Sequence, residues 1–100
     1  MVDIDAVSQW LKSRLATDLI SEVWIFGSAV HALQSFNDVD VFVKYLDDHS
    51  ASIPNLKREV EEGFSDRFGV PLHILFLNNS ESKEAEKFLE SALCHSLRVR

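Results

Sequence analysis

Residues 24–43 read WIFGSAVHALQSFNDVDVFV, and this stretch decides how the chain folds. It holds two apolar segments, each a predicted strand: the first ends at Gly27-Ser28, and the second begins beside Asp38 and Asp40. Alternate residues of a strand point to the same face, so we expect the two carboxylates to project together. Neighbouring carboxylates repel each other unless a cation lies between them, and a glycine–serine turn can offer backbone N–H groups to a phosphate. The stretch therefore indicates a metal site beside a phosphate site, which favours nucleotide chemistry.

The composition indicates one ordinary globular domain over residues 1–100. Hydrophobic residues make up 46% and charged residues 26% of the chain, and no apolar stretch approaches the ~20 residues that span a bilayer. The acidic start and the single cysteine, Cys94, predict neither a secretion signal nor a disulfide framework, so we expect a cytoplasmic protein and no membrane contact. A net charge of −6 argues against general binding to duplex nucleic acid, which needs a basic surface.

The N-terminal half shows helical and strand patterns in turn. Apolar residues recur at helical spacing from Ile4 to Leu19, with Asp3 or Asp5 as the candidate N-cap. Glu22–Phe26 is the first predicted strand, and a short helix over Ala29–Leu33 follows it.

Val39–Tyr45 is the second predicted strand. Its valines should face one way, and Asp40 and Phe42 the other. Trp10 should pack rather than bind, and Trp24 and Phe26 are expected in the core.

The C-terminal half continues the alternation. A second long helix is predicted over Ile53–Phe68, with Gly69 as its stop. Pro71–Leu77 is the third predicted strand, and a last helix carries an apolar stripe from Ala85 to Leu93, capped by Ser80 or Ser82. No element is assigned to residues 98–100.

This order predicts a small α/β (α+β) fold with a sheet of three to four strands covered by helices. The connection between the first two strands is short for a full crossover, so the sheet should be mixed.

The Gly-Ser turn and the Asp-x-Asp strand together resemble the nucleotidyltransferase superfamily typified by DNA polymerase beta. The chain is most similar to its smallest members, the minimal nucleotidyltransferases paired with a helical HEPN protein. The motif covers Val23–Val43, and Gly27, Ser28, Asp38 and Asp40 match it residue by residue. The resemblance implies the polymerase-beta-like fold for the whole chain.

The resemblance also implies an activity. Asp38 and Asp40 would bind one or two Mg²⁺ ions, with Mn²⁺ as an alternative, and Gly27 and Ser28 would hold the outer phosphates of a nucleoside triphosphate, ATP before others. The ions would neutralise charge while the alpha-phosphate is attacked in line. The products would be a nucleotidylated acceptor and pyrophosphate.

The chain departs from the family pattern in the third strand, where the family usually carries a third carboxylate. His73 occupies the matching position. One interpretation makes His73 a general base or a metal ligand in place of the acid. The other makes it a strand histidine with a hydrogen-bond partner and no catalytic role, in which case turnover would be low or absent.

The phosphate side departs as well. The minimal members carry arginines after the Gly-Ser turn, whereas this chain carries Ala29, Val30 and His31. A histidine is only partly protonated near neutral pH, so His31 is either a weak nucleotide-binding residue or a solvated helix residue. Lys44, Lys57, Arg58 and Arg67 are candidates for the rim of the cleft.

Two functions follow from these residues, and an unrelated small α/β interaction domain is a third interpretation. The first is a magnesium-dependent nucleotidyltransferase that transfers a nucleoside monophosphate to an acceptor, for which the resemblance implies a hydroxyl of a HEPN-type partner in a toxin–antitoxin pair. The second is a catalytically degenerate binding module, an antitoxin or complex subunit, with the same fold. Self-association into a homo-oligomer is compatible with both.

Overall fold

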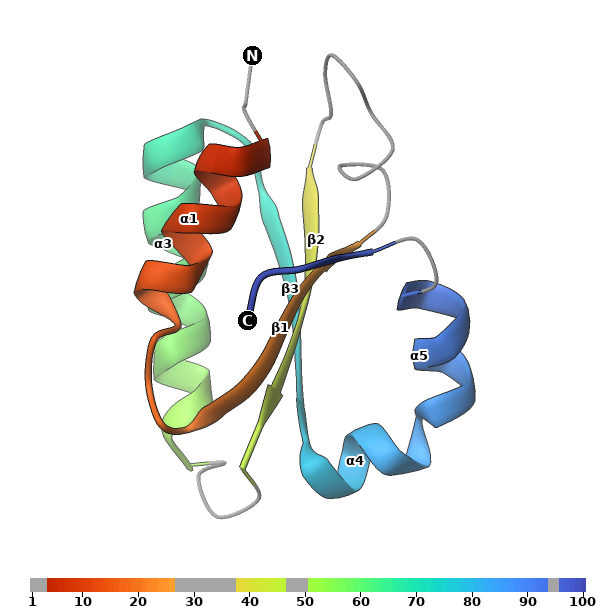
Figure 1. Cartoon of the computed structure of the whole chain (residues 1–100). Coiled ribbons are helices and arrows are strands. Elements are labelled where there is room, and N and C mark those ends of the chain that lie inside the picture. Colours follow the sequence, from red (N-terminus) through yellow and green to blue (C-terminus); the bar gives the residue numbers. More distant parts are fainter. Residues whose placement is uncertain (1–3, 27–37, 47–50, 94–95) are drawn as a thin grey trace.

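The computed structural model describes residues 4–26, 38–46, 51–93 and 96–100, and Figure 1 shows the arrangement of their helices and strands. In chain order the elements are α1 (Ile4–Arg14), β1 (Ile20–Phe26), β2 (Val39–Tyr45), α3 (Ile53–Phe68), β3 (Leu72–Asn78), α4 (Asn79–Glu84), α5 (Glu86–Leu93) and β4 (Leu97–Arg98). The predicted fold class is confirmed: the protein is a small α+β fold built on one four-stranded sheet. Among the described residues, no helix combines the length and the apolar character needed to cross a membrane.

The sheet is mixed, as predicted, with the strand order β3-β2-β1-β4. β1 is antiparallel to both β2 and β4, whereas β2 and β3 are parallel. The parallel pair needs a crossover connection, and α3 supplies it. This crossover brings the start of β3 beside the start of β2, so that Val39 pairs with Leu72 and Asp40 pairs with His73.

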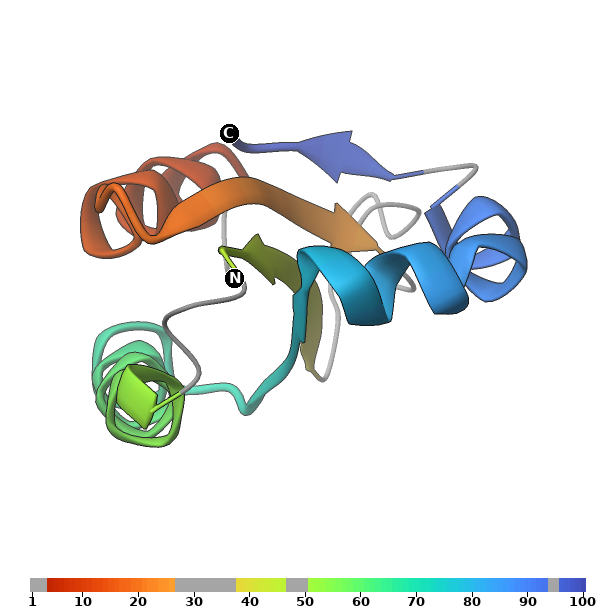
Figure 2. The same ribbon diagram turned by 90° about the horizontal axis from the view of Figure 1, so that it is seen from below.

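Helices α1 and α3 cover one face of the sheet, and α4 and α5 lie on the other (Figures 1 and 2). The face toward α1 and α3 holds the hydrophobic core, where Val39, Val41 and Val43 of β2 are fully buried as predicted. Val7, Leu11 and Leu15 from the first helical stripe meet them there. Helix α1 ends at Arg14 rather than near Leu19. Leu15 follows the helix and is still buried in the core, so the apolar pattern continues beyond the last helical residue.

Aromatic rings join the two core helices. Trp10 of α1 contacts Phe64 and Phe68 of α3 edge-on, with ring centroids 5.6 and 6.0 Å apart. The prediction that Trp10 packs is therefore confirmed. Trp24 and Phe26, by contrast, do not lie in this core: alternation along β1 places Val23 and Ile25 there and turns Trp24 and Phe26, both half-buried, to the opposite face.

Helix α3 ends as predicted at Gly69, which adopts a left-handed backbone conformation with φ of 73° and donates its N–H to the Ser65 carbonyl. This conformation is accessible to glycine because it lacks a Cβ atom.

Replacing Gly69 by alanine should therefore destabilise the fold by about 1–2 kcal/mol. A Cβ atom at this position would meet no other atom within 4 Å, so the cost is one of backbone conformation and not of packing. Chemical denaturation measures the change. Gly69→Asn is the control, because asparagine tolerates left-handed backbone better than alanine; an equal loss in both variants would contradict the explanation.

The predicted last helix is two helices. Asn78, and not Ser80 or Ser82, caps α4: its side chain accepts from the Glu81 N–H at 2.7 Å, and the Glu81 carboxylate accepts from the Asn78 N–H at 3.0 Å. This capping box starts the helix directly after β3. Helix α4 stops at Glu84, and α5 then continues in a new direction (Figure 2). Phe88 of the predicted stripe lies on α5 and is 59% exposed.

The C-terminal residues, to which the sequence assigned no element, complete the sheet. Leu97 and Arg98 form β4 and pair with Ile25 and Trp24. Val99 is buried, and the Arg100 guanidinium donates to the Leu15 carbonyl at 2.6 Å. A two-residue strand is too short to show an alternating pattern in the sequence. It is defined only by its pairing with β1.

Candidate metal centre

Three potential metal ligands lie together where β2 and β3 begin. Asp40 is the second residue of β2, Asp38 immediately precedes the strand, and His73 is the second residue of β3. Parallel pairing places Asp40 and His73 side by side, and alternation turns both away from the α1–α3 core. The sequence-predicted group Asp38, Asp40 and His73 is therefore brought together by the fold.

The geometry is compact. One ligand atom from each of the three residues lies within 4.8 Å of the others. His73 Nε2 is 3.9 Å from Asp38 Oδ2, which is an ion pair when the imidazole is protonated. The side chains of His73 and Asp38 are 62% and 37% exposed, so the group faces solvent and is accessible to an ion or a ligand.

The electrostatics favour a cation. Partial burial raises the pKa of the Asp40 carboxyl, and the charge of Asp38 raises it further, while His73 acts in the opposite direction. A raised carboxyl pKa means that the negative form is disfavoured where it stands. A bound cation would relieve that cost, and two carboxylates with one imidazole form a donor set suited to divalent ions such as Mg²⁺ or Mn²⁺.

A cleft of about 390 Å³ adjoins this group, and Asp40 and His73 line it. Phe26 from β1 and Lys57 and Glu61 from α3 line it as well. Of the four rim candidates, Lys57 lies at this cleft. Glu61 is an acid that the sequence analysis did not single out, because its spacing on an amphipathic helix is that of any surface carboxylate.

The remaining predicted site residues, Gly27, Ser28 and His31, lie outside the described residues, as does the predicted helix Ala29–Leu33. Their assignment to phosphate binding stays a prediction.

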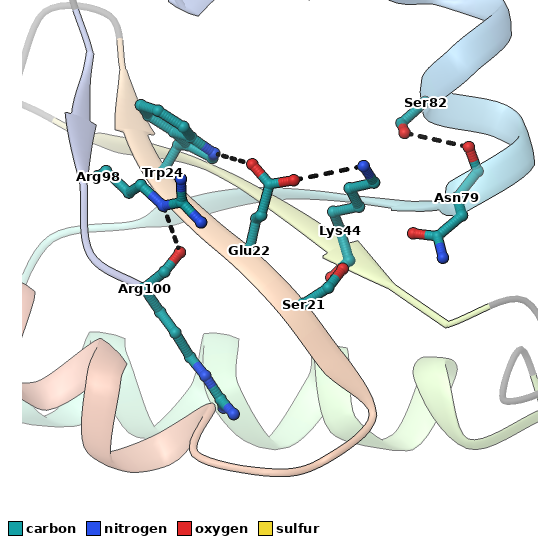
Figure 3. Close-up of polar contacts among 8 residues, drawn as sticks. All are labelled: Ser21, Glu22, Trp24, Lys44, Asn79, Ser82, Arg98 and Arg100. Atoms are coloured by element: carbon teal, nitrogen blue, oxygen red, sulfur yellow. Dashed lines mark hydrogen bonds and ion pairs between the residues drawn. The ribbon is translucent and has the colours of Figure 1, made fainter.

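A second and larger cleft, of about 630 Å³, lies on the face of the sheet that α4 and α5 cover, between these helices and the strands β1 and β2. Trp24 and Phe42 line it, together with a polar network drawn in Figure 3. Trp24 donates its indole N–H to Glu22 Oε1 at 3.0 Å, and Lys44 donates to Glu22 Oε2 at 3.3 Å. Trp24 is thus a cleft residue, which corrects the expectation that it belongs to the core, and Lys44 lies at this cleft rather than at the metal ligands.

The network favours the ionised form of the Glu22 carboxyl. Burial alone would raise the pKa of its carboxyl, but the hydrogen bonds from Trp24 and Lys44, with the charges of Lys44 and Arg98, outweigh it and hold the pKa below the ordinary 4.5. A lowered pKa in the folded state stabilises the fold above the unfolded pKa, and this contribution is lost as pH falls through the folded pKa.

Glu22→Gln should therefore lower the free energy of unfolding at pH 7 by less than about 1 kcal/mol, since the pair is partly exposed. The difference from wild type should shrink once the pH falls below 4.5, the ordinary value. Denaturation curves at several pH values test this. Glu59→Gln, at an exposed position of α3, is the control and should show no comparable trend; a difference for Glu22→Gln that stays constant with pH would contradict the assignment.

Fold and site together define a class: a small α+β protein with a carboxylate–imidazole group at the starts of two parallel strands. Comparison with protein-family models, with curated proteins and with solved structures finds no significant match to this chain.

Proposed function

We propose that this chain is a magnesium-dependent nucleotidyltransferase domain that transfers a nucleoside monophosphate from a nucleoside triphosphate, ATP before others, to an acceptor hydroxyl. The observation that carries the proposal is the group Asp38, Asp40 and His73, whose ligand atoms lie within 4.8 Å of one another. Carboxylates and an imidazole also gather on protein surfaces without a metal. The proposal therefore rests on this group in combination with the Gly27-Ser28 motif.

Each residue has a role in the proposed reaction. Asp38 and Asp40 supply hard oxygen ligands, and a bound Mg²⁺ would offset the charge of the phosphates during transfer. His73 is exposed enough to contact a substrate and can accept the proton of the attacking hydroxyl when its imidazole is neutral. Lys57, on the same cleft, would offer a positive charge to a phosphate in place of the arginines that the motif lacks.

From the resemblance we propose that a partner chain carries the acceptor hydroxyl, and that this partner is a helical HEPN-type protein in a toxin–antitoxin pair. This rests on fold-level analogy and not on any described contact.

A binding module that has lost turnover is the second candidate. The observation in its favour is that His73 replaces a carboxylate and is 62% exposed, because an exposed imidazole holds Mg²⁺ less well than a third carboxylate oxygen would. Such a module would bind nucleotide without transferring it.

Calorimetric titration of the protein with ATP in the presence of Mg²⁺ tests the proposed function. We expect a binding heat for the wild type that disappears on chelation of the metal and in the Asp38→Ala/Asp40→Ala double variant. Arg58→Gln, at a predicted rim position that does not line either cleft, should bind as the wild type does. Absence of heat for the wild type would reject both the enzyme and the nucleotide-binding module.

Transfer separates the two candidates. Labelled ATP incubated with the protein and a co-expressed partner should yield labelled partner if the domain is an enzyme, and His73→Ala should reduce the rate at least about 100-fold if His73 is the base. Binding without transfer would favour the module. An unchanged rate in His73→Ala would reject the catalytic role of this residue.

A further inference from the structure

The larger cleft, between the outer face of β1 and β2 and the helices α4 and α5, is not used by the proposed reaction. Its volume of about 630 Å³ lies in the range of small-molecule sites. Phe42 is its most deeply buried aromatic lining residue, and Trp24 lines it beside Phe42 because the two residues pair across β1 and β2. The cleft therefore offers flat apolar surface next to polar groups.

Trp24 is held in place by three side chains. Its indole N–H bonds to Glu22, Lys44 holds the other oxygen of Glu22, and the Arg98 guanidinium lies 5.3 Å from the centroid of the indole ring (Figure 3). A ring fixed in this way loses little conformational entropy when a flat ligand packs against it. Trp24 is thus a preorganised wall for a planar ligand.

Asn79, at the start of α4, contributes the unusual polar group of the cleft. Its side-chain Oδ1 is buried, yet it accepts no hydrogen bond from any residue that the structure describes. A buried acceptor without a donor is costly. Asn79 lines the cleft, so rotation of its amide toward a donor inside the cleft would remove that cost.

The charges of the lining residues give no preference for an anion. The described lining holds three carboxylates (Glu22, Glu86 and Glu90) and two ammonium groups (Lys44 and Lys83), which leaves a net charge of 2 − 3 = −1. Glu22 and Lys44 already neutralise each other at 3.3 Å. The charged residues that remain, Lys83, Glu86 and Glu90, are exposed and give an anion no net attraction, so a neutral or weakly basic ring suits the cleft better.

We propose that this cleft is a binding site for a neutral planar nitrogen heterocycle that packs against Trp24 and donates an N–H to Asn79. The described lining of this cleft includes none of the residues that have a role in the proposed transfer reaction. The cleft is next to Asp40 along β2, because Asp40, Phe42 and Lys44 are alternate residues of the strand and point to the same face.

Two flat probes of the same shape test the proposal: benzimidazole, which carries an N–H donor, and 1-methylbenzimidazole, which does not. The readout is the pair of indole N–H signals in proton–nitrogen NMR spectra of the chelator-treated protein, because the chain has 2 tryptophans. Trp24 borders the cleft, whereas Trp10 packs against α3 on the opposite face. Trp24→Phe assigns the two signals.

Benzimidazole should shift the Trp24 signal saturably, with a Kd of about 1 mM, and leave the Trp10 signal in place. 1-Methylbenzimidazole and Asn79→Ala should each weaken binding about three- to tenfold, and combining them should add little, because both remove the same hydrogen bond. Benzoate should cause no shift. Asn79→Ala removes an unsatisfied group at the first position of α4, so the variant should fold.

Three results would overturn the proposal: no shift with benzimidazole, equal shifts of both indoles, or equal affinities of the two probes for the wild type. The double variant Asp38→Ala/Asp40→Ala distinguishes this proposal from the proposed function. It should abolish binding of ATP with Mg²⁺ and leave benzimidazole binding unchanged, so either proposal can fail without the other.

Discussion

Phe64→Ala should destabilise the protein by about 3–5 kcal/mol, the largest loss that we expect from a single substitution. Phe64 is fully buried in the centre of the α1–α3 core. Its ring centroid lies 4.7 Å from that of Phe68 and 5.6 Å from that of Trp10, so the truncation removes apolar burial and two ring contacts and leaves a cavity. Since small domains are stable by only about 5–15 kcal/mol, this loss would be a large share of the total free energy of unfolding.

Urea denaturation followed by circular dichroism measures this change. The matched control is Phe88→Ala, the same substitution at a residue of α5 that is 59% exposed. Its loss should stay below about 1 kcal/mol. Comparable losses in the two variants would contradict the placement of Phe64 at the centre of the core and of Phe88 at the surface.

Asp40→Asn should have the largest functional effect, and its effects on ligand binding and on stability should have opposite signs. Loss of a direct metal ligand should weaken binding of ATP with Mg²⁺ by more than about 100-fold. Mutation of residues that only hydrogen-bond a metal ligand already lowers metal affinity by about 10- to 100-fold. Without metal, the variant should melt at a higher temperature than the wild type at pH 7. The reason is that partial burial and the charge of Asp38 raise the pKa of Asp40, so its ionised form is unfavourable in the fold.

The sign of the stability effect follows from the raised pKa. A carboxyl whose pKa is higher in the folded state favours the fold at low pH, and that contribution is lost as pH rises through the folded pKa. The gain from Asp40→Asn should therefore be present at pH 7 and disappear in acid. Thermal melts at pH 7 and in acid measure this gain in stability, and Asp66→Asn, at an exposed position of α3, is the control. A variant less stable than wild type without metal would mean that Asp40 has a structural role.

Local patterns in the sequence predicted the elements of the fold well. Period-two alternation predicted β2 with its bounds and placed its three valines in the core, and helical spacing with Gly69 gave the bounds of α3. These predictions hold because burial on one face is a property of each segment taken alone. The shared face of Asp38 and Asp40 follows from the same alternation.

Several errors came from features that a single segment does not encode. Trp24 and Phe26 are as apolar as core residues, and only the position of α1 and α3 decides which face of β1 is the inner one. The break between α4 and α5 and the pairing of β4 likewise depend on neighbouring elements. The second cleft is lined by residues of α4, α5, β1 and β2, so no single motif in the sequence predicts it.

The same distinction between local pattern and tertiary contact applies to the candidate metal ligands. The sequence by itself determined that two carboxylates lie at the start of a strand, that they share a face, and that a fold of alternating helices and strands carries them. The family resemblance suggested His73 as the third member, but only the tertiary structure decided that it lies beside Asp40, because the two strands pair across the α3 crossover. Pairing between strands that are distant in the chain is a property of the packed molecule, whereas the direction of a side chain along one strand is a property of the strand.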